Sequence, residues 1–298
     1  MIGDVMQAAT RQLCGEVTTR VADTLIEKMR RPGRPYIADV SSMDVWFAAS
    51  DVHNLCPRLY AMAMQAGGVM REEVDAETLF NFAVGTAYHR AFQDEMLPAG
   101  LAGVFQGCWE RELNGVLEKS EGATHGPHTE RGWGPKPEGD YWEFQEPKGR
   151  VADFRLVGKW DGVLAWPDAP HEVLELKSIR EELFGHVNPH AGGKPLVAHL
   201  RQVQAYMWMS GLERARIVYV RKGAGSLRES MAEHVVVRDE AAIECLRVDL
   251  TACMSAVSGA TRGEAFPVKL TECRIKSDPR ARKCVCRDAC FAAAKAGK

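Results

Sequence analysis

The stretch His171-Glu172-Val173-Leu174-Glu175-Leu176-Lys177-Ser178 decides the fold of this chain. It is typical of a β-strand, in which every second side chain points to the same face. Glu175 and Lys177 then share one face, while Leu174 and Leu176 share the other. A carboxylate beside an ammonium on an interior strand is costly unless a cation or a substrate uses the pair. On its own, such a triplet is more often a solvated ion pair on a surface hairpin, so the residues around it matter.

A second apolar run, Val157 to Trp166, precedes this strand, and Pro167-Asp168-Ala169-Pro170 between the two is a turn signal. We expect the two runs to form a hairpin, which would place Asp161 close to opposite Glu175. Cβ atoms of cross-strand neighbours lie roughly 5 Å apart, so both carboxylates could reach one divalent ion.

The run from Asp75 to Phe92 has apolar residues at helical spacing and an N-cap candidate in Asp75. Gly85 and His89 are four residues apart on one face of this helix, and Gly85 costs it roughly 1 kcal/mol relative to alanine. A glycine one turn before a histidine indicates that something approaches this face closely. The alternative for His89 is a core histidine bonded to the backbone.

A second helix is predicted over Val197 to Met209, with Gln202 and Tyr206 one turn apart on its polar face. A glutamine and a tyrosine placed in this way can bind a phosphate or hold a lysine. As an isolated pair they indicate little.

Four motifs now stand in order along the chain: Gly85-x-x-x-His89, Gly158-x-x-Asp161, Glu175-x-Lys177 and Gln202-x-x-x-Tyr206. This order resembles the RecB-like branch of the PD-(D/E)XK nucleases. The resemblance implies an α/β fold with a restriction-endonuclease-like mixed central sheet flanked by helices.

The cysteines extend the resemblance. Cys56 precedes the first motif, and four cysteines, Cys273, Cys284, Cys286 and Cys290, follow the last one. This split arrangement is similar to iron–sulfur exonucleases of the CRISPR-associated and AddB types and to their phage-encoded relatives. The family's downstream spacing is usually C-x2-C-x5-C, whereas here ten residues separate the first two cysteines. The resemblance implies a [4Fe–4S] cluster on Cys56, Cys273, Cys284 and Cys290, with Cys286 as a spare or a substitute.

The same resemblance assigns roles to the motifs. It implies that His89, Asp161, Glu175 and the main-chain carbonyl of Leu176 hold Mg²⁺ or Mn²⁺, for which hard oxygen ligands are suited. Lys177 would orient a water or stabilise the charge on phosphorus, with Gln202 and Tyr206 supporting Lys177 and the phosphate backbone. The implied activity is a DNA exonuclease acting on single strands or duplex ends. A helicase or recombination partner and self-association are compatible with it.

Composition sets further bounds. With 298 residues, 46% of them hydrophobic, the chain can bury a large core. It has no apolar run of membrane length and no secretory signal, so we expect a cytoplasmic protein with reduced thiols and no membrane partner. Cys14, Cys108, Cys245 and Cys253 are then interpreted as small core residues. A net charge of −2 gives no overall basic signature for DNA, although basic residues gather in the cysteine-rich tail.

We expect three regions. Residues 1–45 form a helical lead, 46–270 the nuclease core with a flexible loop at 121–139, and 271–298 a cysteine-rich tail that closes onto Cys56. Two other functions remain open. One is a catalytically silent nucleic-acid-binding protein stapled by zinc, since four thiolates suit zinc as well as iron–sulfur. The other is a nuclease subunit active only within a recombination or spacer-acquisition complex.

Overall fold

The computed structural model of the chain describes residues 31–32, 45–67, 73–74, 76–113, 115–120, 124–139, 141–223, 226–282, 284 and 286–296. Helices and mixed sheets alternate in these ranges, which confirms the α/β class. Most of the expected helical lead over 1–45, including Cys14, and the N-cap candidate Asp75 lie outside the described residues. No helix within these ranges is both long and apolar enough to cross a bilayer.

The main sheet has the strand order β14-β13-β12-β11-β4-β5. Its strands are β14 (Met231–Val237), β13 (Arg214–Arg221), β12 (Glu172–Ile179), β11 (Gly162–Leu164), β4 (Phe105–Leu113) and β5 (Val116–Ser120). Two short strands, β7 (Gly134–Pro135) and β8 (Glu143–Gln145), also pair with β4. β12 and β13 run parallel and their neighbours antiparallel, so the predicted mixed sheet is present.

A smaller sheet has the order β2-β10-β9-β6. It contains β2 (Phe47–Ala48), β10 (Leu156–Lys159), β9 (Lys148–Val151) and β6 (Thr129–Arg131). A two-residue pair, β1 (Arg31–Pro32) with β3 (Glu73–Val74), lies apart from both sheets.

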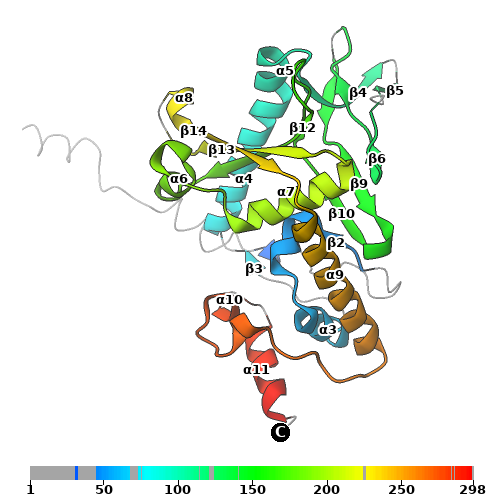
Figure 1. The fold of residues 1–298 in the computed structure, drawn as a ribbon, viewed down its shortest axis with the longest axis vertical. Helices are drawn as coiled ribbons and strands as arrows, with labels where there is room; N and C mark the ends of the chain where they lie inside the picture. Colours follow the sequence, from blue (N-terminus) through cyan, green and yellow to red (C-terminus); the bar gives the residue numbers. More distant parts are fainter. Residues whose placement is uncertain are drawn as a thin grey trace, which may run out of the picture.

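Helices flank the main sheet (Figure 1). Those nearest to β12 are α4 (Ala76–Arg90), which continues as a π-helical turn (Ala91–Met96) into α5 (Leu97–Gly100), and α7 (Val197–Ser210). α3 (Pro57–Gln65) and α9 (Glu240–Thr261) pack side by side below the sheet, next to α10 (Pro279–Arg282) and α11 (Arg287–Ala296). Shorter helices are α6 (Glu181–Val187), α8 (Leu227–Ser230) and the 3-10 turns Ala49–Asn54, Ala152–Phe154, Pro189–Ala191 and Thr271–Cys273.

β12 separates two apolar cores, as the alternation of its residues predicts. Val173 packs in the larger core, which includes Val203 and Met207 of α7. Leu174 and Leu176 point the other way, into the core that contains Phe92 from the π-helical turn. The strand is buried through most of its length, so its polar residues are held between two apolar layers.

The predicted hairpin forms, with one correction. β11 pairs antiparallel with β12 and Gly162 is opposite Leu174, so the same register places Asp161, the residue before β11, opposite Glu175. The run from Val157 to Trp166 is not one strand, however. It is interrupted at Trp160 and Asp161, because β10 belongs to the smaller sheet and β11 to the main one.

The flexible loop expected at 121–139 is also corrected. Its described part contributes β6 to one sheet and β7 to the other. Trp133 is 1% exposed and packs against Trp160 with ring centroids 6.2 Å apart. The indole of Trp109 donates a hydrogen bond to the Gly134 carbonyl at 3.1 Å. A buried aromatic side chain and sheet hydrogen bonds fix a segment whose composition is typical of a loop.

Candidate active site

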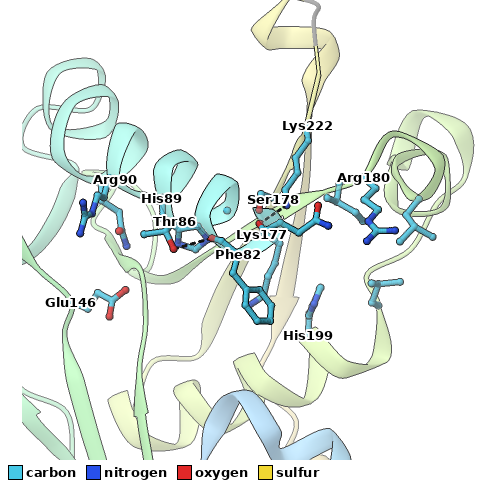
Figure 2. A pocket seen from close by; sticks show the side chains of 16 residues that line it. Phe82, Thr86, His89, Arg90, Glu146, Lys177, Ser178, Arg180, His199 and Lys222 are labelled. Atoms are coloured by element: carbon cyan, nitrogen blue, oxygen red, sulfur yellow. Dashed lines mark hydrogen bonds between the residues drawn. The ribbon is translucent and has the colours of Figure 1, made fainter. Parts of the chain in front are cut away.

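A pocket of about 780 Å³ opens at the end of β12 where Lys177 emerges. Its wall is formed by α4 on one side, by the start of α7 on another, and by the chain leaving β12 and β13. Figure 2 shows Lys177 between Arg90 at one end of this pocket and Arg180 and Lys222 at the other. The motif residues His89 and Lys177 both line it.

Glu175 and Lys177 form an ion pair within β12. The Glu175 side chain is 3% exposed and that of Lys177 is 23% exposed, so the carboxylate is interior while the ammonium reaches the pocket. Burial raises the pKa of Glu175 to about 7; Lys177 opposes this shift and Asp161 adds to it. The pKa of Lys177 is raised by both carboxylates in spite of its burial, so the lysine stays charged.

The Asp161 carboxylate is held on both oxygens. Oδ2 accepts the Leu176 backbone N–H at 2.7 Å, and Oδ1 lies 3.1 Å from His89 Nδ1 and 3.0 Å from Gln93 Nε2. The contact with Asp161 contributes to a raised pKa of His89, which burial by itself would lower. His89, Asp161, Glu175 and Lys177 are therefore brought together from α4, the turn before β11, and β12.

Two glycines of the motifs allow close packing here. A Cβ on Gly85 would lie 3.2 Å from Ser178 Oγ, so the predicted close approach is that of β12 itself. A Cβ on Gly158 would lie 2.7 Å from Met209 Cε and 2.9 Å from the Tyr206 ring. Gly85 lets α4 approach β12, and Gly158 lets β10 approach α7, the helix that carries Gln202 and Tyr206.

Gln202 and Tyr206 lie deeper than the sequence predicts. They are 5% and 3% exposed, and Gln202 Nε2 donates to the Tyr206 hydroxyl at 2.6 Å. Neither lines the pocket that Lys177 enters. Burial and then the charge of Glu175 raise the pKa of Tyr206. A direct contact of this pair with a phosphate stays a prediction, because the face of α7 that carries Gln202 and Tyr206 is buried.

The donor set suits a hard divalent cation. The site contains two buried carboxylates and an imidazole, and Asp161 is among the causes that keep the pKa of Glu175 high, so the site favours added positive charge. Within the described residues, no three His, Cys, Asp or Glu side chains stand as they would around a metal ion. Glu175 pairs with Lys177 instead, so metal binding would require this carboxylate to turn toward Asp161 and His89.

Five cysteines from the two ends of the described chain line a second pocket, below the sheet. They are Cys56, Cys273, Cys284, Cys286 and Cys290. Cys56 precedes α3, Cys273 ends a 3-10 turn and Cys290 is in α11. No disulfide joins the cysteines that the structure describes.

Hydrogen bonds from two arginines, Arg58 and Arg280, join the C-terminal segment to α3 and the residues just before it. Arg58 is 7% exposed and donates to Cys290 Sγ at 3.2 Å and to the Pro267 carbonyl at 2.7 Å. Arg280 donates to the Leu55 carbonyl at 2.9 Å. These contacts join the tail to the residues around Cys56, whereas closure of the two ends by a cluster stays a prediction.

Cys284 and Cys286 differ in their surroundings. Cys286 is 1% exposed and packs with Leu59 and Met62. A hydrogen bond from Cys286 lowers the pKa of Cys284 to about 6, while the same bond raises that of Cys286. Of the remaining cysteines, Cys108 and Cys253 are buried as expected, whereas Cys245 is exposed on α9.

Several residues at the pocket belong to none of the sequence motifs. Gln93 contacts Asp161 and lies one helical turn after His89, so its spacing was an available signal. Glu146 has no such signal; burial and then Asp161 raise its pKa. His199, Arg180 and Lys222 reach the pocket through the fold alone.

No family model matches this chain, and no curated protein matches it significantly. Solved structures resemble it in part. An alkaline exonuclease from Laribacter hongkongensis, LHK-Exo, aligns at 13% identity and a TM-score of 0.44 over 73% of this chain and 90% of its own. LHK-Exo in complex with dAMP aligns at 14% identity and a TM-score of 0.45, over 75% of this chain and 93% of its own. A phage-related exonuclease from Haemophilus somnus 129PT aligns at 11% identity and a TM-score of 0.34, over 74% of this chain and 96% of its own. At these values the resemblance carries no argument about the function of this chain.

Proposed function

We propose that this protein is a divalent-metal-dependent DNA exonuclease whose catalytic site is the Lys177 pocket. One observation carries the proposal: the interior Glu175 carboxylate lies close to a second buried carboxylate and is paired with Lys177, which reaches a pocket with basic ends. A structural ion pair would need no such pocket. A phosphodiester could lie along it, because Arg90, Arg180 and Lys222 offer positive charge on either side of Lys177 (Figure 2).

Each residue then has a role. Asp161, Glu175, His89 and the Leu176 carbonyl would hold Mg²⁺ or Mn²⁺, which when bound acidifies water and neutralises phosphate charge. Lys177 orients the attacking water or stabilises charge on the phosphate. Gln93 and the Leu176 N–H fix the Asp161 carboxylate from both sides. Tyr206 and Gln202, buried on α7, would support Lys177 and the Glu175 carboxylate from the interior.

The preference for single strands or frayed ends is supported by an exposed aromatic ring in the pocket. Phe82 is 60% exposed and lines the wall that α4 provides. Unpaired bases stack on aromatic rings, whereas the bases of an intact duplex are stacked already. A basic groove with an aromatic ring beside it suits a strand whose bases are splayed.

We further propose a structural [4Fe–4S] cluster on Cys56, Cys273, Cys284 and Cys290. Five cysteines at one pocket, in a chain that we expect to be cytoplasmic, favour a metal or cluster over disulfides. Cys286 stays the spare, since it is buried among apolar side chains and donates toward Cys284. Zinc on the same thiolates is the competing assignment, and the colour of anaerobically purified protein separates the two.

The proposal is tested by digesting 5′- and 3′-labelled single and double strands with Mg²⁺ or Mn²⁺. Wild type is compared with Asp161→Ala and Glu175→Ala. We expect cleavage only with metal and only in wild type, with DNA binding retained in both variants. Wild-type protein that binds but cleaves nothing alone would favour a silent binding protein or a subunit that needs partners, such as a helicase. Those partners, self-association and the cytoplasmic location remain predictions.

A further inference from the structure

One histidine of the pocket belongs to none of the motifs. His199 is half-buried on the first turn of α7 and lines the pocket together with Lys177. In Figure 2 its ring rises from α7 on the side where Lys177 descends from β12. The proposed chemistry of the carboxylates and the lysine leaves this imidazole without a function.

The ring is held by a buried tyrosine. Tyr219 is fully buried on β13 and stands opposite Lys177 in the strand register. Its hydroxyl accepts the Leu196 backbone N–H at 3.1 Å and lies 2.9 Å from His199 Nδ1. Among the described residues, His199 Nδ1 is the acceptor that the structure places within reach of the Tyr219 hydroxyl proton. A buried hydroxyl left without an acceptor is unfavourable, so Tyr219 donates to Nδ1.

This hydrogen bond determines the tautomer. A neutral imidazole that accepts on Nδ1 carries its proton on Nε2. The structure records no partner for Nε2 within the described residues, so the Nε2 edge of the ring is left for the pocket. Burial, and after it the charges of Lys177 and His53, lower the pKa of His199 to about 4. The ring is therefore neutral at physiological pH and donates without adding a second cation beside Lys177.

We propose that His199 is a substrate-binding residue, whose Nε2–H donates a hydrogen bond to a phosphate oxygen next to the position of Lys177. Tyr219 is its positioning residue, because it fixes both the orientation of the ring and its tautomer. This inference rests on the proposed nuclease function and adds to it a neutral donor that the motifs do not contain. A histidine that served only packing would leave no donor directed at the pocket.

Three substitutions at this position separate donation from packing. His199→Gln keeps an amide N–H near the position of Nε2. His199→Asn places its amide near Nδ1, so it can keep the contact with Tyr219 but offers no donor to the pocket. His199→Ala removes both, and Tyr219→Phe removes the positioning hydroxyl. Thermal unfolding of each variant checks that the fold is intact.

Affinity for a fluorescein-labelled single-stranded oligonucleotide is measured by anisotropy without divalent metal, and cleavage is measured with Mn²⁺. A hydrogen bond to a charged group contributes about 1.5–3 kcal/mol, so losing it should weaken binding roughly tenfold or more. We expect this loss in His199→Asn and His199→Ala, as a raised KM with little change in kcat. His199→Gln should stay within about threefold of wild type, and Tyr219→Phe should fall between.

Wild-type affinity and KM in His199→Asn would overturn the proposal, as would equal impairment of the folded glutamine and alanine variants. The outcome for the nuclease function is separate. If wild type binds DNA without cleaving it, the nuclease proposal fails and the affinity series still decides the role of His199. If wild type neither binds nor cleaves, both proposals are overturned.

Discussion

Glu172 and Glu175 are buried to the same extent on β12, each 2% exposed, but their partners differ. Glu172 binds Arg216 at 2.8 Å, and Arg216 also binds Glu233, so this carboxylate belongs to an ion-pair network across the sheet. Glu175 is paired within its own strand to a lysine that reaches a pocket. Burial of a charge is costly in both cases, and only the second pair faces space that a substrate can enter.

The compact ammonium of Lys177 predicts sensitivity to a conservative change. Arginine keeps the charge but replaces a point-like group with a planar fork, which cannot take the same position beside a water. Lys177→Arg should therefore lower kcat by at least about a hundredfold, while affinity for DNA is retained. Single-turnover cleavage and anisotropy measure the two quantities. Near-normal turnover would mean that Lys177 is structural.

His199 predicts a pH dependence of stability. Its pKa is lowered from 6.5 to about 4 on folding, so between these values the unfolded chain binds the extra proton. The stability contributed by neutral His199 is complete above pH 6.5 and is lost as the pH falls toward 4. The loss amounts to at most about 3 kcal/mol before screening by water in the pocket. Denaturant unfolding at pH 4.5 and 7.5 should show a smaller acid loss for His199→Gln than for wild type. An equal loss in both proteins would contradict the assignment.

At the scale of elements, local periodicity was sufficient for β12, α4 and α7. Each has a side-chain repeat that one segment carries by itself, and the structure forms all three. Periodicity could not reveal the break at Trp160 and Asp161, because two different sheets compete for the strands on either side. It also missed the complete burial of Gln202 and Tyr206, which comes from elements packed on α7 that lie far away in the sequence.

The residues of the candidate site divide in the same way, into those that the local sequence predicts and those that only the assembled fold brings in. Glu175, Lys177, Asp161 and His89 were predictable because their spacing is part of an ordered motif. Glu146 and His199 could not be singled out, since they reach the pocket only when the fold is assembled, whereas Gln93 could have been found from its place one helical turn after His89. Cys245, expected in the core, is exposed because it lies on the outer side of α9.

α4 carries two exposed phenylalanines that allow a matched comparison. Phe80 is 69% exposed and Phe82 60% exposed, but only Phe82 is among the residues lining the Lys177 pocket. Stacking of a base on an aromatic ring contributes about 1–3 kcal/mol. Phe82→Ala should weaken single-strand affinity roughly tenfold, with Phe82→Trp close to wild type and Phe80→Ala unchanged. Fluorescence anisotropy decides this. Equal effects of the two alanine variants would remove the stacking role.

At the scale of the whole molecule, the cysteine pocket joins segments that are far apart in sequence. Cys56 and Cys273 are separated by roughly two hundred residues, and closing a loop of that length is worth on the order of 5 kcal/mol in the chain-entropy model. A bound cluster would add its own binding free energy to folding. With a cluster bound, the tail would therefore stabilise the rest of the chain without contacting the Lys177 pocket.

Cluster loss should follow the assignment of ligands. Cys56→Ser, Cys273→Ser, Cys284→Ser and Cys290→Ser should lose iron and unfold at lower temperature, because each removes a thiolate. Cys286→Ser should keep its iron, as should Cys245→Ser, the exposed control on α9. Iron analysis of anaerobically purified protein and thermal unfolding measure this. Loss of iron in Cys286→Ser but not in Cys284→Ser would exchange these two cysteines, and stoichiometric zinc in wild type would replace iron–sulfur with zinc.

The most direct test of the nuclease proposal compares the two buried glutamates of β12. Cleavage of an end-labelled single strand with Mn²⁺ is measured for wild type, Glu175→Gln and Glu172→Gln, with thermal unfolding as the check on folding. Glu175→Gln should lose at least about a hundredfold in rate. Glu172→Gln should stay within about tenfold of wild type, since Arg216 keeps Glu233 as a partner. Cleavage by folded Glu175→Gln at the wild-type rate would contradict the proposed site.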